Sequence, residues 1–499
     1  MSALPGEPAD GVVFPLSVDG RRSTSALGRA VVADALRPVE PASAAGAEQE
    51  PNWRSGYLAH FRRLVEAGLA SNAAALSIAQ AGLGSLHDRM RVAWPAAAET
   101  GLAALRSAPA QASCTTVTVP GSGQPEPGLS LPYHGEELRD GALARQLDSW
   151  VTAGIIEPSC ADAVREVAAH PEWLPLPGQT VVALGAGAEV GPVTPLLAWG
   201  ARVAAIDLPS PQLWERVLGL ARRGAGTLLV PVRQGEEPPP GDDDQAIARR
   251  AGLDLARAVP DAAGWLASLD GPLVLGNYVY ADGAANVAVS AAADALTVRV
   301  QAARPDLALA FLATPTDVFA VPADAVAQSV RAYDTRSRLA KLAGPPLRLA
   351  SGGRLLRRAY PPGADPGIND SLVSQQGPNY ALAKRLQRWR ATVARQAGTT
   401  VSLNVAPPTR TRSVLKNRAL AAAYAGAHRF GAQVFEPATT RVLMAALLVH
   451  DLHTAGPAHP HPWQDEAYAA AHGGLWRIAY APRSALVLAA LLGYAAGRP

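Results

Sequence analysis

The chain has 499 residues, too many for one ordinary domain of about 100–200 residues, so two or three units are expected. Its hydrophobic fraction of 48% and charged fraction of 17% exclude a mainly disordered protein. Lys and Arg total 45 against 42 Asp and Glu, which gives no general attraction to nucleic acid, and no nucleic-acid partner is expected.

Cysteine usage and hydropathy indicate the cellular compartment of the protein. The two cysteines, Cys114 and Cys160, are too few for a disulfide framework, and the first residues lack the basic and apolar regions of a secretory signal. The longest apolar run, residues 485–496, is shorter than the about 20 residues that cross a bilayer. We therefore expect a cytoplasmic protein without a transmembrane span, and a peripheral membrane contact stays open.

The first third of the chain divides into two regions. Residues 1–50 repeat Pro, Gly, Ala and Glu with weak periodicity, which predicts a partly ordered leader. Residues 51–177 contain apolar side chains at helical spacing, for example Leu58, Phe61 and Leu64, and predict a mainly helical N-terminal region.

From residue 178 to 455, short aliphatic runs alternate with Ala-rich helical runs. This pattern predicts an α/β fold, a doubly wound parallel sheet of the Rossmann-like kind, followed by a C-terminal extension over 456–499. The predicted strands are residues 180–184, 203–206, 227–232, 273–275, 307–312 and 401–405.

The first of these strands leads into a glycine-rich turn, Gly185-Ala-Gly187-Ala-Glu189-Val-Gly191, and the second ends at Asp207. Glycines let backbone approach a pyrophosphate, a following helix N-terminus offers free N–H groups, and an acidic strand end accepts from ribose hydroxyls. Asp207 would also repel a 2′-phosphate, so NAD is the expected cofactor and NADP the less favoured one. The charge of Glu189 would oppose a pyrophosphate unless its side chain points outward.

A second motif, Tyr380-Ala-Leu-Ala-Lys384, follows much later. On a helix these two side chains lie one turn apart on the same side. The Lys384 ammonium is then expected to lower the pKa of the Tyr380 phenol toward the working pH, which makes the phenol a usable acid or base.

With the glycine turn, the Tyr-Lys pair and the strand exit at Pro407 in this order, residues 178–455 resemble the short-chain dehydrogenase/reductase superfamily. Glu189 stands where that family has the middle glycine of its turn. The resemblance implies an NAD(P)-dependent oxidoreductase that interconverts an alcohol and a carbonyl. Tyr380 would be the acid/base, and Lys384 would assist it and bind the nicotinamide ribose.

Further roles follow from the same resemblance. Asp254 would contact the adenine, and Asn277 matches one asparagine of the family's motif after the fourth strand. Pro407 and Thr411 correspond to the strand exit and to the threonine that holds the nicotinamide amide. Members of the family commonly form dimers or tetramers, so a homo-oligomer stays open.

The family places a catalytic serine shortly before the tyrosine, but here the interval is much longer. This predicts a large insertion over about residues 318–370 and leaves Thr314 as the serine's replacement, with Thr316, Ser371 and Ser374 as alternatives. Eight basic residues lie between 331 and 358 with a single acid, Asp334. They are interpreted as a solvated loop, with an anionic substrate or a membrane surface as alternative partners.

Two other functions fit parts of the pattern. The turn with Asp207 also resembles the cofactor turn of S-adenosylmethionine-dependent methyltransferases, whereas Glu189 and the displaced serine suit a non-catalytic nucleotide-binding or scaffold protein. No metal site is expected, because the late histidines lack a His-Glu-x-x-His helix. For the oxidoreductase, a bulky or apolar small molecule is the expected substrate.

Overall fold

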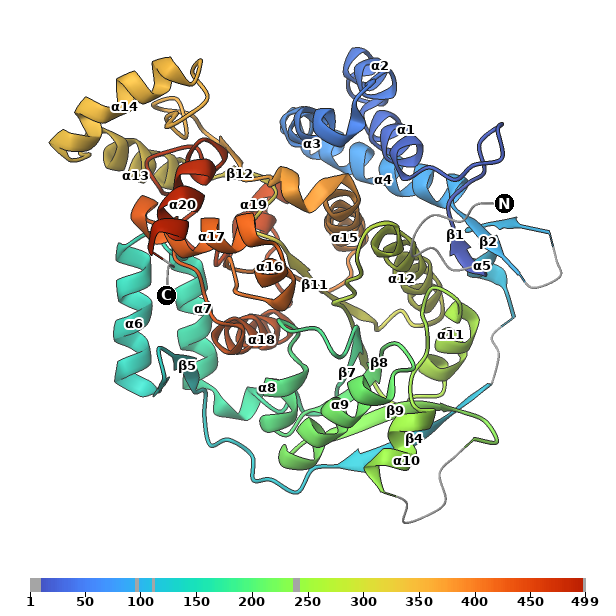
Figure 1. The fold of residues 1–499 in the computed structure, drawn as a ribbon. Coiled ribbons are helices and arrows are strands. Elements are labelled where there is room, and N and C mark those ends of the chain that lie inside the picture. The colour runs from blue at the N-terminus through green and yellow to red at the C-terminus, as the bar shows by residue number, and fades with distance from the viewer. Residues whose placement is uncertain (1–9, 95–97, 110–112, 237–242, 497–499) are drawn as a thin grey trace.

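The computed structural model describes residues 10–94, 98–109, 113–236 and 243–496 (Figure 1). Its centre is a seven-stranded sheet in which six neighbouring strands are parallel and the edge strand β4 is antiparallel to β9. The strands in sheet order are β14 (Val401–Val405), β11 (Ala308–Ala313), β10 (Leu273–Asn277), β7 (Thr180–Leu184), β8 (Arg202–Ile206), β9 (Thr227–Arg233) and β4 (Cys114–Pro120). The six predicted strands are confirmed, and the fold is α/β with a mostly parallel sheet.

The sheet is buried on both faces because alternate side chains enter two separate cores. In β7, Val182 and Leu184 belong to one core, whereas Val181 and Ala183 belong to the other. Continuous apolar strands of this kind are typical of parallel sheets that helices cover on both sides. The helices that build the first core are α11 (Val259–Ala267), α12 (Ala284–Ala303) and α15 (Gly377–Gln396). The second core is built by α8 (Val193–Ala198), α9 (Pro211–Arg223) and α18 (Pro437–Thr454).

The N-terminal residues differ from the prediction. From residue 10 onward the expected leader forms β1 (Gly11–Val13), α1 (Thr24–Leu36) and α2 (Pro41–Glu48), while residues 1–9 lie outside the described part. Ser23 caps α1 by accepting from the Ala26 N–H, and Val31 and Leu36 are fully buried. The periodicity is weak because Ala and Gly on both sides of α1 reduce the contrast between its faces.

The region predicted as mainly helical contains α3 (Trp53–Gly68), α4 (Asn72–Arg89), α5 (Ala104–Ser107), α6 (Asp140–Thr152) and α7 (Pro158–Ala169). It also contains short strands, namely β2 (Arg91–Ala93), β3 (Thr100–Gly101), β5 (Leu131–Tyr133) and β6 (Glu136–Leu138). Because β4 joins the central sheet, the sheet begins before residue 178. Helix α4 packs directly on α15, where a Cβ on Gly82 would lie 2.3 Å from the Trp389 ring.

The segment between β11 and α15 adds a two-stranded sheet and two helices, and its residues Val318 and Phe319 belong to the first core. It contains β12 (Val318–Val321), α13 (Ala323–Asp334), α14 (Arg338–Ala350) and β13 (Gly367–Asp370), with β12 and β13 paired antiparallel. The remaining helices are α10 (Asp244–Arg250), α16 (Arg412–Lys416), α17 (Arg418–Gly426), α19 (Pro462–Ala467) and α20 (Pro482–Ala496). Among the described residues, no helix combines the length and hydropathy needed to cross a membrane.

Candidate active site

A cavity of about 1210 Å³ lies at the carboxyl ends of the parallel strands. Its lining takes Gly185 from the exit of β7, Asp207 from β8, Tyr278 from β10, Thr314 from β11 and Pro407 from β14. Strand exits that meet at one edge of a parallel sheet form the usual ligand crevice of such folds. The glycine turn and the Tyr380-Lys384 pair therefore line the same cavity, although 189 positions separate Gly191 from Tyr380 in the chain.

The glycine turn and the acidic strand end are in direct contact. Gly185 has a φ of +85°, and a Cβ there would lie 2.8 Å from the Tyr278 carbonyl oxygen, so the turn requires glycine. The Asp207 carboxylate accepts from the N–H of Gly187 and from that of Leu208, both at 2.8 Å. Burial raises the pKa of Asp207, and these two N–H groups oppose the rise. Gly187 and Asp207, both predicted to contact a cofactor, therefore lie side by side at the cavity.

Helix α8 contributes less to the turn than the sequence suggested. It begins at Val193 and has only six residues, so its dipole is small. Gly191 precedes it and does not line the cavity, in contrast to Gly185 and Gly187. Gly191 is therefore a turn residue rather than part of the cavity wall.

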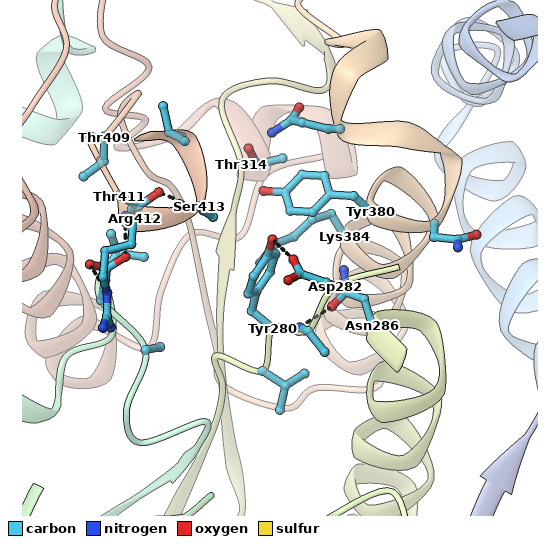
Figure 2. Close-up of a pocket in the computed structure, with 18 of the residues that line it drawn as sticks. Tyr280, Asp282, Asn286, Thr314, Tyr380, Lys384, Thr409, Thr411, Arg412 and Ser413 are labelled. Carbon is cyan, nitrogen blue, oxygen red and sulfur yellow. Dashed lines mark hydrogen bonds and ion pairs between the residues drawn. The ribbon is translucent and has the colours of Figure 1, made fainter. Parts of the chain in front are cut away.

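The charge of Glu189 is paired across the cavity. Its carboxylate accepts from the backbone N–H of Arg412 at 2.8 Å and from Nε of the same residue at 2.9 Å. Figure 2 shows Arg412 with these bonds on the side of the cavity opposite Tyr380. Glu189 thus lines the cavity instead of pointing outward, and Arg412 of α16 compensates its charge.

Tyr380 projects from the first turn of α15 toward Thr314 (Figure 2). Burial raises the pKa of the Tyr380 phenol above 10.0, and the neighbouring Thr314 hydroxyl offsets part of this rise. The expectation that Lys384 would bring this pKa down is wrong, because desolvation of the phenol dominates. At neutral pH Tyr380 is therefore a protonated acid.

Lys384 is fixed by two acceptors below the cavity floor. Its Nζ donates to the Leu312 carbonyl at 3.2 Å and to Oε1 of Gln387 at 3.1 Å. Burial lowers the pKa of Lys384 from 10.5 to about 8. Gln387 in turn donates to Oδ1 of Asn277 at 3.2 Å. Asn277 does not line the cavity, so it positions α15 through Gln387 rather than touching a cofactor.

Of the four candidate hydroxyls, the structure brings one next to Tyr380. Thr314 lines the cavity, and its hydroxyl lies 2.9 Å from that of Thr316. Ser371 is buried and donates to Asn369 at 2.5 Å, whereas Ser374 sits at the exposed rim and bonds to Gln375. Thr314 is therefore the residue that can share a ligand atom with the Tyr380 phenol.

Asp254 is a correction to the sequence prediction. It lies outside the cavity lining, and its carboxylate accepts from the Ala256 N–H at 3.1 Å and pairs with Arg257. It closes its own turn and cannot contact an adenine in the cavity. Pro407 and Thr411 do line the cavity, and the Thr411 hydroxyl lies 3.0 Å from that of Ser413.

Several cavity residues were missed by the sequence analysis. Tyr280 donates to Asp282 at 2.9 Å, and its ring meets the Tyr380 ring edge-on at a centroid distance of 6.2 Å. Burial raises the pKa of Tyr280 to about 12. Asn286 accepts from the Ala281 N–H and fixes this loop. The available signal was a polar segment, Tyr278 to Asp282, directly after a fully buried strand.

The basic segment of the insertion, residues 331–358, lies away from the cavity. None of the basic residues between 331 and 358 lines the cavity, and several have partners of their own, such as Arg336, which lies 3.2 Å from the ring centre of Tyr333. Arg358 pairs with Asp334. Within the described ranges, no group of three or more His, Cys, Asp or Glu side chains is placed to hold a metal ion.

No protein-family model matches the chain, and no curated protein matches it significantly.

Proposed function

We propose that the chain is an NAD(P)-dependent oxidoreductase of the short-chain dehydrogenase/reductase kind that interconverts an alcohol and a carbonyl. The observation that carries this proposal is the single cavity lined by Gly187, Asp207 and the Tyr380-Lys384 pair. The sheet order supports it, because β9-β8-β7-β10-β11-β14 reads 3-2-1-4-5-6 along the chain, the order of doubly wound dinucleotide-binding folds.

The residues present fit a dinucleotide. Gly185 and Gly187 line the cavity without side chains of their own, and Asp207 offers a carboxylate for ribose hydroxyls. The Glu189 charge that would oppose phosphates is compensated by Arg412. A cavity of about 1210 Å³ exceeds the roughly 300–1,000 Å³ of ordinary ligand pockets and leaves space for a second molecule. NAD is the proposed cofactor, with NADP less favoured because of Asp207.

The chemistry of the protein groups follows from their protonation. A bound nicotinamide supplies the hydride that forms the new C–H bond. Tyr380, protonated at neutral pH, donates its proton to the carbonyl oxygen, and Thr314 donates a hydrogen bond to the same oxygen. Lys384 holds positive charge beneath the phenolate that remains, and solvent returns the proton. Oxidation of an alcohol runs the same steps backward.

One titration separates this function from its alternatives. The purified protein is titrated with NADH, NADPH and S-adenosylmethionine, and bound NADH is then offered a panel of carbonyl compounds. Tight NADH binding with turnover supports the oxidoreductase, and S-adenosylmethionine binding alone supports a methyltransferase. NADH binding without turnover of any carbonyl supports a scaffold.

We also propose a cytoplasmic location with peripheral contact to anionic membrane surfaces through α14. Figure 1 shows α14 at the outer edge of the molecule, beyond α13. Leu339, Leu342 and Leu349 are 74–85% exposed there, and residues 335–364 contain seven basic side chains and no acidic ones. Co-sedimentation with anionic but not with neutral vesicles is expected. Concentration-dependent self-association without vesicle binding would instead assign α14 to a homo-oligomer.

A further inference from the structure

A second cavity lies beside the main one and has a different chemical character. It measures about 70 Å³ and is lined by α17, α20 and the segments next to them. We call it the apolar chamber, because its walls include Ala423, Phe430, Ile478, Leu486 and Ala489. A volume of this size holds roughly five water-sized groups.

The chamber adjoins the reacting position. Pro408 and Tyr424 line both cavities, so the two spaces share a wall. Thr316 lines the chamber, and its hydroxyl lies 2.9 Å from that of Thr314, which faces Tyr380. A carbonyl oxygen held between Tyr380 and Thr314 therefore places one substituent of the carbonyl carbon near the chamber.

Of the four polar side chains in the chamber wall, three are already engaged. Ser371 donates to Asn369, Thr316 bonds to Thr314, and the Arg483 guanidinium donates to Asp370 at 2.7 Å. Burial raises the pKa of the Tyr424 phenol, which therefore stays neutral. A polar substituent would lose its hydrogen bonds to water and meet a mostly apolar wall in which the Tyr424 hydroxyl is the polar side chain left to pair with it, whereas a hydrocarbon group loses nothing.

The roof of the chamber has little freedom to expand. Helices α17 and α20 lie side by side with their backbones in contact (Figure 1), since a Cβ on Gly426 would lie 2.0 Å from the Ala489 carbonyl oxygen. A Cβ on Gly493 would lie 1.9 Å from the Ala422 carbonyl oxygen. Close-packed helices at two glycines fix the distance between the walls, so the chamber limits the length of the group that it admits.

We propose that the apolar chamber binds a short hydrocarbon group attached to the reacting carbon, so that the substrates are aldehydes, ketones or alcohols with a small alkyl chain. This inference rests on the proposed function. It adds that specificity is set by α17 and α20, on the side of the site away from the cofactor turn.

The test is a series of straight-chain aldehydes from two to eight carbons, reduced with NADH. We expect kcat/KM to rise about fourfold per methylene over the first few carbons and then to level off, because each buried methylene contributes a transfer free energy of this size. Ala423→Leu fills the chamber and should abolish the rise. Leu486→Ala enlarges it and should move the plateau to longer chains.

Ala425→Leu is the matched control, because Ala425 lies on the same helix, is exposed and lines neither cavity. The dependence of kcat/KM on aldehyde chain length should be the same in Ala425→Leu as in the unmodified protein. A flat profile in the unmodified protein, or the same rise in Ala423→Leu, would overturn the chamber proposal while leaving the oxidoreductase standing. Failure to bind NADH or to reduce any carbonyl would overturn the proposed function itself.

Discussion

At the scale of single residues, the proposed chemistry depends on the protonation of two buried groups. Burial keeps Tyr380 protonated and brings the pKa of Lys384 to about 8, so both groups hold a proton at neutral pH. The pair is therefore set to donate, which favours the reductive direction. As pH rises through about 8, Lys384 loses its charge, and reductive turnover should fall.

Lys384→Met should separate catalysis from stability. A charged amine whose pKa is lower in the folded than in the unfolded protein weakens folding below pH 8, and this penalty disappears as pH rises toward 10.5. We expect the variant to lose turnover and to gain up to about 3 kcal/mol in free energy of unfolding at pH 7. Thermal melting measures the gain. Lys341→Met, on the exposed helix α14, should change neither quantity, and a destabilised Lys384→Met would refute the assigned burial cost.

Asp207→Ser should change cofactor choice. Removing the carboxylate deletes hydrogen bonds to a charged acceptor, each contributing about 1.5–3 kcal/mol, so NADH affinity should fall roughly tenfold or more. The affinity for NADPH should fall less, because the substitution removes the repulsion of the 2′-phosphate. The cationic side chain of Arg216 also lies nearby, where it donates to the Gly187 carbonyl. Fluorescence titration measures both constants. Asp254→Asn, outside the cavity, is the control, and equal losses in the two variants would contradict the role of Asp207.

At the scale of elements, α16 and the glycine turn are connected by one ion pair. Glu189 and Arg412 meet across the cavity, although Arg412 is 64% exposed and the pair contributes little to stability. Its importance lies in the charge that it presents to an incoming phosphate. The turn lacks its usual middle glycine, and α16 supplies the compensating cation.

Glu189→Gln should bind NADH a few-fold more tightly with nearly unchanged melting temperature. The substitution keeps the hydrogen-bond acceptor for the Arg412 N–H and removes a negative charge from the cavity wall. Isothermal titration measures the affinity, and the gain should shrink at high salt. Weaker NADH binding would mean that the ion pair organises the site instead of opposing the cofactor.

The order of elements could be predicted from the sequence, whereas contacts between distant elements could not. Short runs rich in apolar residues and the glycine at position 185 are local signals, so the strands and the turn could be placed from the sequence. The pKa of Tyr380 depends on what surrounds the phenol, and Asn277 reaches Lys384 only through Gln387. Such properties arise when α15 docks on the sheet, and no spacing in the sequence encodes them.

At the scale of the whole molecule, the N-terminal helices hold α15 in place. His87 of α4, Asp294 of α12 and Arg390 of α15 form a buried cluster, with Arg390 donating to both carboxylate oxygens at 2.6 and 2.7 Å. Residues 10–90 are thus part of the structure that orients Tyr380. Weak periodicity concealed this role from the sequence analysis.

Asp294→Ala should destabilise the protein by about 3–5 kcal/mol, because it leaves the Arg390 guanidinium buried without a partner. Arg390 and His87 hold the pKa of Asp294 well below its ordinary value. The contribution of Asp294 to the free energy of unfolding is therefore present above pH 4 and is lost as pH falls below 4. Denaturant unfolding at pH 7 and pH 3 measures both effects. Asp306→Ala, in an exposed pair with Arg304, should have little effect at either pH.

The central claim is that the Tyr380 phenol gives its proton to a carbonyl beside a bound nicotinamide. The most direct test measures NADH binding and NADH consumption with a reducible carbonyl in the unmodified protein and in Tyr380→Phe. The account predicts an unchanged NADH dissociation constant and a loss of turnover of at least about a hundredfold. Turnover retained by Tyr380→Phe would contradict it.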